Sequence, residues 1–277
     1  MVASLPITPV VLTYNEEPNI RRTLDSLVWA ERVVVVDSGS TDATEVIAKS
    51  FPNVDWYART FDSFKGQCDY AIYHTGIATK YVLALDADMA VSGDLLTEIE
   101  DNFSAGSFDG GLLKFDFRLV GRSLAGSLYP AQVRLFRRDR VRVLQTGHGH
   151  KFSVDGALYR FKQSLIHDDR KPLERWVASQ LSYSALEARR IAARESYQFR
   201  DRVRELGVMP VIAGALAYIR AGGPFRGAAA VRYAYERAAY ESLLVIRLMS
   251  AKLEANQKSA TDPLQLQPRK LSEPDSK

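Results

Sequence analysis

Two carboxylates one residue apart, Asp86 and Asp88, are the side chains whose spacing first suggests cation chemistry in this sequence. They follow residues 81–85, a short and almost wholly apolar run that is typical of a buried strand in a parallel sheet. Ligands of open α/β sheets bind beyond the carboxyl ends of the strands, where both aspartates would emerge. Mg²⁺ often takes one or two carboxylates together with phosphate oxygens of a substrate. So short a motif could also be an acidic turn without a ligand, and the neighbouring elements decide between these two interpretations.

Polar residues also follow the two strands predicted at the start of the chain. Residues 7–12 form a β-branched run that ends shortly before Asn15 and Glu16, and Asn15 is predicted to be the N-cap of a helix. Residues 33–36 are four valines that run directly into Asp37. Strand, turn and helix, repeated twice, predict a doubly wound sheet in which these strand ends converge on one crevice.

The composition is that of an ordinary globular protein, with 46% apolar and 25% charged residues in 277 positions. The single cysteine, Cys68, excludes an intramolecular disulfide and is compatible with a reducing compartment. The sequence shows neither the pattern of a signal peptide nor an apolar run approaching about 18 residues. We therefore expect a cytoplasmic location.

Charge is distributed unevenly along the chain. Residues 1–113 carry 7 Lys and Arg against 17 Asp and Glu, residues 114–175 carry 14 against 6, and residues 176–277 carry 16 against 10. An acidic first part suits a metal site, and the basic later parts suit an anionic ligand or a membrane surface. Nucleic acid is not an expected partner, because the sequence lacks zinc-ligand spacing, RNA-binding aromatic motifs and a basic zipper.

Three motifs taken together resemble those of a known enzyme family: Thr13-Tyr14-Asn15-Glu16, Val-Val-Val-Asp-Ser-Gly-Ser-Thr-Asp from position 34, and Leu85-Asp86-Ala87-Asp88. In type and spacing, residues 7–100 resemble the N-terminal half of the family 2 glycosyltransferases. The resemblance implies an α/β architecture, the GT-A fold, whose mostly parallel central sheet is flanked by helices and here is followed by a C-terminal helical extension. It also implies a nucleotide-sugar donor, usually linked to UDP, with Mg²⁺ or Mn²⁺ as cofactor.

The same resemblance implies roles for individual residues. The donor-binding residues that it implies are Thr13, Asn15, Glu16, Asp37 and Asp86. The first three would line the nucleoside pocket, the fourth would face the base, and the last would lie at the ribose or the metal. Asp88 would ligate the cation that bridges the diphosphate. His167 follows an apolar segment, as does a histidine that often supplies a late metal ligand in related transferases, and imidazole readily accompanies carboxylates on Mn²⁺.

A general base is the remaining requirement of the implied chemistry. Family members of this type invert the anomeric centre in a single displacement, so a base must take the proton of the acceptor hydroxyl. Relatives in the lipopolysaccharide-core subgroup carry His-Glu where this sequence has His148-Gly149-His150-Lys151. Because that glutamate is missing, His150 is the first candidate for the base and Asp168 is the second.

A basic cluster accompanies the strand that is predicted at residues 131–138. Its members are Arg134, Arg137, Arg138, Arg140 and Arg142. A solvated edge strand protected by charge is the preferred interpretation of this cluster. Contact with phosphate is the alternative.

Helices are predicted from residue 173 onward. Residues 208–219 are apolar but too few to cross a bilayer, so they form a core helix or one at a membrane surface, and the flanking arginines favour the surface. We predict four parts: a nucleotide-sugar-binding half at 1–117, an acceptor-side half of the same domain at 118–172, a helical region at 173–253, and a disordered tail at 254–277.

The sequence therefore predicts a metal-dependent, inverting hexosyltransferase that uses a nucleotide-sugar, most simply a UDP-sugar. Its acceptor would be a lipid-linked or cell-envelope glycan, and the chain would bind peripherally to the cytoplasmic face of the inner membrane. The main alternative is a non-catalytic protein of the same fold that binds nucleotides or glycans. A sugar nucleotidyltransferase is disfavoured, because its phosphate loop after the first strand would be basic and Gly-rich, whereas this one is acidic.

Overall fold

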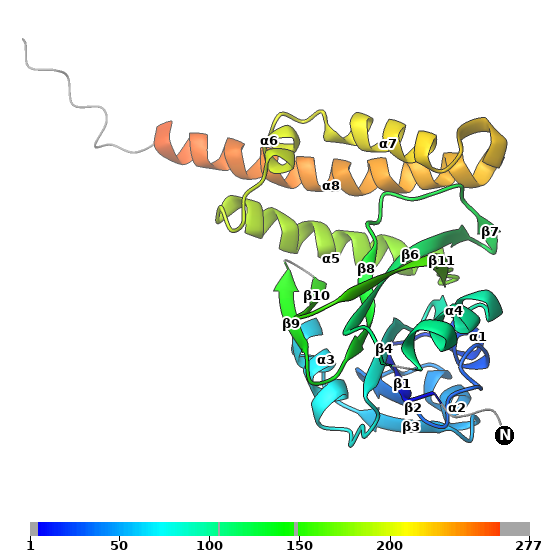
Figure 1. The fold of residues 1–277 in the computed structure, drawn as a ribbon. Helices are drawn as coiled ribbons and strands as arrows, with labels where there is room; N and C mark the ends of the chain where they lie inside the picture. Colours follow the sequence, from blue (N-terminus) through cyan, green and yellow to red (C-terminus); the bar gives the residue numbers. More distant parts are fainter. Residues whose placement is uncertain (1–4, 105, 147–148, 261–277) are drawn as a thin grey trace, which may run out of the picture.

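The computed structural model describes residues 5–104, 106–146 and 149–260. Its first part alternates strands and helices along one continuous sheet (Figure 1). The elements are β1 (Ile7–Thr13), α1 (Ile20–Asp25), β2 (Val33–Asp37), α2 (Thr44–Lys49), β3 (Val54–Ala58), α3 (Phe64–Tyr73) and β4 (Tyr81–Asp86). The four strands pair in parallel in the order β3-β2-β1-β4. The predicted doubly wound arrangement of this part is confirmed.

The second part of the sheet is mixed in direction. It comprises β5 (Met89–Ala90), α4 (Gly93–Phe103), β6 (Gly110–Leu119), β7 (Arg122–Ser123), β8 (Gln132–Arg137) and β11 (Leu158–His167). The sheet continues from β4 as β8-β6-β11-β5, with β7 paired to β6. β8 runs antiparallel to both of its neighbours, whereas β11 runs parallel to β6. A separate hairpin is formed by β9 (Val141–Thr146) and β10 (Gly149–Val154).

The interpretation of the basic cluster as an edge strand is wrong. β8 lies between β4 and β6 inside the sheet, and the side chain of Arg134 is only 8% exposed. A buried arginine needs a carboxylate partner, because an unpaired charge inside a protein is very costly. Arg134 finds that partner in Asp86 at the end of the neighbouring strand. The cluster of arginines suggested a solvated edge, but its member Arg134 takes part in an internal ion pair.

Two apolar clusters cover the two faces of the sheet. One is formed with α1, α2 and α4, and it includes the buried side chains of Leu24 and Phe103. The other is formed with α3 and the β9–β10 hairpin, and it includes Ile72 and Phe152. Each fully buried side chain of this size contributes roughly 1.5–3 kcal/mol. The sheet is therefore held from both sides while the carboxyl ends of its strands are left for a site.

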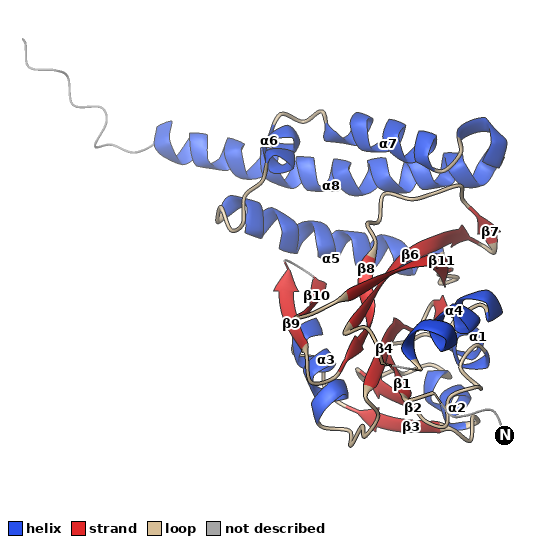
Figure 2. Ribbon diagram, in the orientation of Figure 1, coloured by secondary structure: helices blue, strands red, loops and turns tan. Residues whose placement is uncertain are grey.

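Helices follow β11 and form a layer on one side of the sheet, as Figure 2 shows in blue above the red strands. They are α5 (Leu173–Ala192), α6 (Phe199–Glu205), α7 (Met209–Arg220), the short 3₁₀ helix η1 (Gly223–Arg226) and α8 (Gly227–Ala260). α5 lies between α8 and the strands (Figure 1). The helical extension is confirmed. α8 continues to Ala260, past the boundary predicted at residue 253, and the rest of the predicted tail lies outside the described residues.

A buried ionic cluster fastens this helical layer together. Arg204 of α6 pairs with Glu187 of α5 at 2.9 Å, with Asp201 at 3.1 Å and with Glu241 of α8 at 2.8 Å. Arg190 adds a second cation, which pairs with Glu187 at 3.0 Å and with Asp201 at 2.9 Å. These ion pairs compensate two cations with three anions in an almost water-free place, so removing one partner would be costly.

Candidate active site

The loops that follow β1 and β2 interlock at one edge of the sheet. Thr13 and Asp37 are register partners at the strand ends. The Asp37 carboxylate accepts hydrogen bonds from the backbone N–H groups of Gly39 (2.9 Å) and Ser40 (2.8 Å), which forms the turn. The Ser40 hydroxyl in turn accepts from the Asn15 N–H at 2.7 Å. Asp37 thus positions this loop, and its contact with a nucleobase stays a prediction.

The predicted capping role of Asn15 is wrong. Asn15 has a left-handed backbone conformation with φ of 51°, and α1 begins only at Ile20. Its side-chain oxygen accepts from the Thr41 N–H at 2.7 Å. Asparagine tolerates the left-handed region better than most residues, which explains its place in this loop. Asn15 therefore joins the two strand-end loops rather than starting the helix.

Asp86 belongs to an ion pair on one side of the site. Its Oδ2 lies 3.1 Å from Nη2 of Arg134. Burial opposes ionisation of Asp86, but the nearby cations, Arg134 first among them, outweigh it and hold the pKa of the carboxyl below its usual value. Asp86, Arg134 and His150 of β10 together line a small cavity. Burial lowers the pKa of the His150 imidazole, so the ring is neutral at neutral pH.

Asp88 and His167 meet on the other side, brought together by β5 and β11. His167 is the register partner of Met89, which directly follows Asp88. Oδ2 of Asp88 lies 3.8 Å from Nε2 of His167, which is too long for a good hydrogen bond but short enough for one cation to touch both. Phe117 stacks on the imidazole with ring centroids 4.7 Å apart. Asp88 Oδ1 and His167 Nδ1 are buried and have no hydrogen-bond partner among the described residues.

Glu16 is held beside this pair by the segment that follows β11. Its Oε1 lies 2.6 Å from Nζ of Lys171, and its Oε2 accepts from the Asn19 side chain at 2.8 Å. Lys171 also approaches Asp169 at 3.4 Å. Burial raises the pKa of Glu16 to about 7 against the opposing effect of Lys171, and the nearby Asp88 carboxylate raises it further. The expected place of Glu16 in the nucleoside pocket is not tested by these contacts.

Both carboxylate oxygens of Asp168 accept hydrogen bonds from neighbouring residues. Oδ1 accepts from the Gly121 N–H at 3.0 Å, and Oδ2 accepts from Nε of Arg170 at 2.9 Å. The Asp168 side chain is nearly inaccessible to solvent, and its backbone carbonyl accepts from Arg22 of α1. Such a carboxylate is well suited to hold the loop after β11 in place and poorly placed to accept a proton from a substrate.

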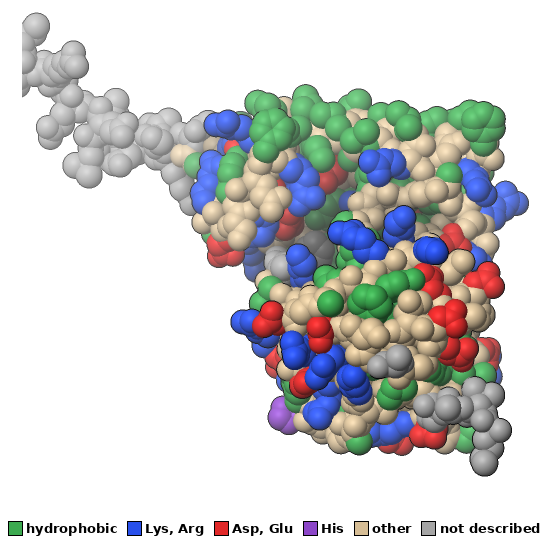
Figure 3. All heavy atoms as spheres, in the orientation of Figure 1, with side chains coloured by type: hydrophobic (Ala, Val, Ile, Leu, Met, Phe, Trp, Pro, Cys, Tyr) green, Lys and Arg blue, Asp and Glu red, His purple; other side chains and the backbone are tan. Residues whose placement is uncertain are grey.

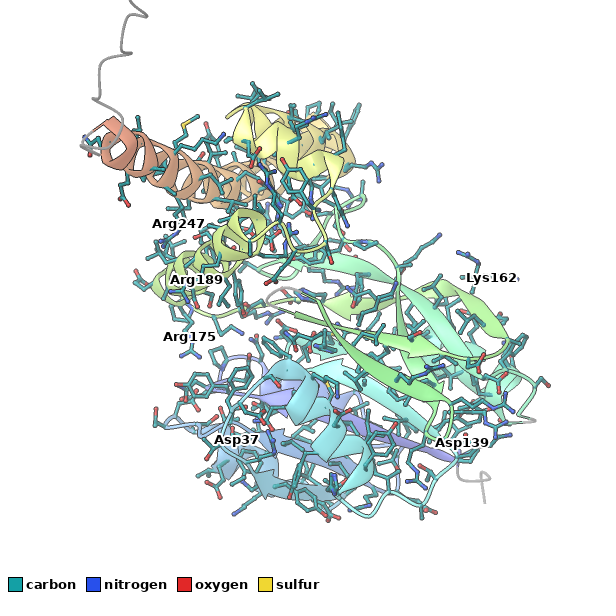
Figure 4. The ribbon with its side chains drawn as sticks, turned by 90° about the vertical axis from the view of Figure 1, so that its left-hand side faces the viewer. Asp37, Asp139, Lys162, Arg175, Arg189 and Arg247 are labelled. Carbon is teal, nitrogen blue, oxygen red and sulfur yellow. The ribbon has the colours of Figure 1, made fainter. Side chains whose placement is uncertain are left out.

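The helical layer supplies the opposite wall. Tyr183 of α5 packs against the apolar cluster between α5 and α8, and burial raises the pKa of its hydroxyl, on which the charges of Lys171, Asp86 and Asp88 also act. Arg175 at the start of α5 packs over the Tyr14 ring at 4.9 Å and donates to the Tyr14 carbonyl at 3.2 Å. Figure 4 shows Arg175 projecting from α5 towards the part of the sheet that carries Asp37. In Figure 3 the molecule is hollowed between the helical layer and the sheet.

The structure thus divides the predicted residues into two groups around one strand end. Asp86 and His150 share the side of Arg134, whereas Asp88, His167 and Glu16 share the side of Lys171. Within the described ranges, no group of three or more His, Cys, Asp and Glu side chains gathers to hold a metal. A cation here would rely on Asp88 and His167 together with oxygens of a substrate; one carboxylate with phosphate oxygens suits Mg²⁺, and the imidazole favours Mn²⁺ over it.

Sequence reasoning missed three residues of this site: Arg134, Lys171 and Tyr183. Arg134 carried a signal, because it stands between Val133 and Leu135 in a strand, where a buried arginine implies a carboxylate partner. Lys171 stands beside the predicted Asp168, but only the tertiary structure shows that it reaches Glu16. Tyr183 lies on a helix whose packing direction the sequence does not reveal. His148, the neighbour of the first base candidate, lies outside the described residues.

The α/β sheet thus presents an acidic pair at the end of β4 and a histidine at the end of β11, an arrangement that suits a ligand bound at the carboxyl ends of the strands. The family model of Glycosyl transferase family 2 matches residues 9–164, which cover the sheet and most of these side chains. The chain therefore belongs to glycosyl transferase family 2. The predicted family and fold class are confirmed.

Curated relatives match shorter stretches. The lipopolysaccharide core biosynthesis glycosyltransferase LpsC of Rhizobium meliloti is 30% identical over 76 residues, which cover 26% of this chain and 28% of that protein. An uncharacterized glycosyltransferase of Rickettsia bellii is 34% identical over 104 residues, 37% of this chain and 34% of its own length. The matched stretch spans about a third of the length of each of these relatives.

Solved structures match larger shares of the chain at lower sequence identity. Residues 1–349 of S. aureus TarS, crystallised with UDP-GlcNAc, are 13% identical, with a TM-score of 0.47 over 90% of this chain and 92% of that one. Glucosyl-3-phosphoglycerate synthase from Mycobacterium tuberculosis, crystallised with Mn²⁺, UDP and glucosyl-3-phosphoglycerate, is 18% identical, with a TM-score of 0.43 over 65% and 80%.

Proposed function

We propose that this chain transfers a sugar from a nucleotide-sugar, most simply a UDP-sugar, to a lipid-linked or cell-envelope glycan, with inversion at the anomeric carbon. The observation that carries the proposal is the pair formed by Asp88 and His167. Oδ2 of Asp88 and Nε2 of His167 approach to 3.8 Å at the carboxyl ends of the strands, and the other oxygen of Asp88, Oδ1, is buried without a partner among the described residues. Nδ1 of His167 is also buried and unpaired there, but it points away from this gap. Buried polar atoms are normally satisfied, so the exceptions indicate a missing ligand.

The donor would bind across the loops after β1 and β2. Thr13 adds a third buried atom without a partner in the described residues, its Oγ1, at the end of β1. Asn15, Glu16 and Asp37 surround that strand end, and we propose that this loop pair holds the nucleoside. Lys171 would compensate the charge of the diphosphate next to Asp88. Mg²⁺ or Mn²⁺ held by Asp88 and His167 would supply the charge stabilisation of the departing nucleoside diphosphate.

The acceptor hydroxyl needs a base, and His150 is the better of the two candidates. Its imidazole is neutral at neutral pH and lines a cavity beside Asp86. Both carboxylate oxygens of Asp168 already accept hydrogen bonds, one from the Gly121 N–H and one from Arg170, so neither is free to approach an acceptor hydroxyl. We therefore assign proton removal to His150 and the positioning of the loop after β11 to Asp168.

The acceptor side would be formed by the hollow under α5, the helix that carries Tyr183, on which the charges of Asp86 and Asp88 act. This arrangement supports an acceptor-side half at residues 118–172 that is closed by the helical region. A lipid-linked acceptor implies a peripheral contact with the membrane face. Within the part of the chain that is described, none of the helices has both the length and the apolar character to cross a bilayer.

Calorimetry with UDP tests this function most directly. We expect UDP to bind in the presence of Mn²⁺ and to bind at least tenfold more weakly when EDTA replaces the metal. Subsequent incubation with UDP-, GDP- and dTDP-sugars, followed by measurement of released nucleotide, identifies the donor. Binding of UDP without any donor turnover would favour the non-catalytic alternative, and absence of both would exclude the proposal.

A further inference from the structure

Helix α7 buries its small side chains and exposes most of its large apolar ones. It packs against α8 through the buried alanines Ala213 and Ala217. A Cβ atom added to Gly214 would lie 3.3 Å from Cβ of Ala238, so the two helices approach closely there. The large side chains point away from α8, and Val211 and Ile219 are 77% and 70% exposed. A surface helix of a soluble protein normally presents polar residues to water and buries its large apolar ones.

The exposed apolar surface continues beyond α7. Phe225 of η1 is 94% exposed, which is extreme for a phenylalanine. A groove of about 320 Å³ between α7 and α8 is lined only by apolar side chains, tyrosines and a glycine, from Pro210 to Ala238. The exposed apolar side chains of this region are together called the apolar face: Val211, Ile212, Leu216, Ile219, Phe225, Val231 and Tyr235. Figure 3 shows hydrophobic side chains gathered along this side of the molecule, over α7 and α8.

Charge around the apolar face is mostly of one sign, and the exception is Glu236 of α8, which pairs with Arg232 at 2.8 Å. Residues 206–235 contain Arg220, Arg226 and Arg232 and no Asp or Glu. All three arginines are exposed. A second copy of the chain docking here about a two-fold axis would bring the same arginines towards each other, which is unfavourable. Anionic lipid headgroups would instead be attracted by about 1 kcal/mol for each basic residue near the surface.

We propose that the apolar face docks onto an anionic lipid bilayer, with α7 lying along the membrane surface. Val211, Ile219 and Phe225 enter the boundary between headgroups and acyl chains, and the three arginines lie among the headgroups. This is the arrangement of an interfacial amphipathic helix, which buries its apolar side by roughly 5–10 Å. The docking does not depend on the enzymatic reaction. Only the further step, that the acceptor resides in the same bilayer, rests on the proposed function.

Co-sedimentation of the full chain with vesicles tests the docking. We expect binding to vesicles of equal parts phosphatidylglycerol and phosphatidylcholine and much weaker binding to phosphatidylcholine alone. The double variant Val211→Ser/Ile219→Ser should lower the binding constant by about tenfold for each side chain. The matched control Val46→Ser changes a valine of α2 that is 74% exposed, and it should have no effect.

Charge variants separate the two parts of the attraction. Arg220→Gln/Arg226→Gln should lower binding to the anionic vesicles about fivefold for each charge removed and leave binding to neutral vesicles unchanged. Lys162→Gln removes an exposed charge of β11, which lies on the sheet away from the helical layer (Figure 4), and should not change binding. Equal losses in the control variants would show that the attraction is not specific to the apolar face.

Three further measurements make the outcome decisive. Because the substituted side chains are exposed, each variant should remain folded, and thermal melts check this. Light scattering that finds a dimer in the wild type and a monomer in Val211→Ser/Ile219→Ser, with no vesicle binding, would overturn the proposal in favour of a contact between copies. Calorimetry with UDP and Mn²⁺ should be unchanged in all variants. Vesicle binding without UDP binding refutes the proposed function alone, whereas UDP binding without vesicle binding refutes the docking alone.

Discussion

Asp86 and Asp88 should respond in opposite ways to the same Asp→Asn change in the metal-free protein. Asp86 is paired with Arg134, whose side chain is 8% exposed, at 3.1 Å. Coulomb attraction at that distance is about 5 kcal/mol at an effective dielectric constant of 20, which is a ceiling. Because the Asp86 side chain is 39% exposed, solvent screening reduces this value, and we expect Asp86→Asn to cost about 2 kcal/mol of unfolding free energy.

Among the described residues, Asp88 has no partner as close as Arg134 is to Asp86; His167 Nε2 lies 3.8 Å away, and Lys171 and Arg22 attract its charge from a longer range. Oδ1 of Asp88 is buried without a hydrogen bond among the described residues, and Glu16 lies close enough for its pKa to be raised by the Asp88 charge. Asp88→Asn removes this repulsion and a desolvated charge while it keeps the shape of the side chain. The metal-free variant should therefore be as stable as the wild type or more stable by up to about 1 kcal/mol.

Calorimetric melts in EDTA and in Mn²⁺ distinguish these effects. In EDTA, Asp86→Asn should lower the melting temperature by about 4–8 °C and Asp88→Asn should leave it unchanged or raise it. At a Mn²⁺ concentration of 100 times the dissociation constant, the wild type should gain about 2.7 kcal/mol, and Asp88→Asn should lose this gain. The opposite order in EDTA, with Asp88→Asn as the destabilised variant, would refute the assignment of Arg134 and of the metal to different aspartates.

Three other predictions concern the base, the donor-side lysine and the helical layer. His150→Gln should lower kcat by 10²–10⁴-fold without changing UDP affinity. Because the pKa of His150 lies below its usual value, the fall in kcat/KM that it causes should lie below about pH 6.5 and be absent from the variant; the same fall in both proteins would exclude His150. Lys171→Met should lower the free energy of unfolding by about 3 kcal/mol, and by more at pH 8 than at pH 6, because Glu16, whose pKa is raised from 4.5 to about 7, bears an unpaired charge only as the pH rises. Urea melts that show the same loss of stability at both pH values would contradict this prediction. Arg204→Met should lower the free energy of unfolding by about 3–5 kcal/mol, whereas the control Arg202→Met, on the exposed side of α6, should lower it by less than about 0.5 kcal/mol. Similar losses of stability in the two variants would show that the ionic cluster is not buried in solution.

Local patterns predicted the first half of the fold well because each element there carries its own signal. Residues 33–36 are apolar on every side, which only a strand covered on both faces can satisfy, and they are fully buried in β2. Asp86 and Asp88 were placed correctly because a strand end fixes where the next side chains emerge. The register of β1 with β2 and β4 then brings those ends together, as the parallel order of the sheet requires.

Long-range pairing explains what the sequence could not predict. β8 is antiparallel and internal, so Arg134 has a partner 48 positions away in Asp86, and no local pattern indicates a strand's place in a sheet. The link between Glu16 and Lys171 spans 155 positions. The N-cap prediction for Asn15 failed for a local reason, because asparagine suits both a helix start and a left-handed turn.

The helical layer connects the two proposals, since it covers the candidate site with one side and carries the apolar face on the other. α5 lies next to the strands, α8 lies on α5, and α7 lies on α8 (Figure 1). Packed helix axes are about 8–10 Å apart, so two such spacings separate the axis of α7 from that of α5 by up to about 20 Å. If α7 lies on the bilayer, a hydroxyl that reaches His150 must stand well clear of the headgroups. An acceptor that bears several sugars satisfies this requirement, whereas a single sugar on a lipid does not, because it remains at the membrane surface.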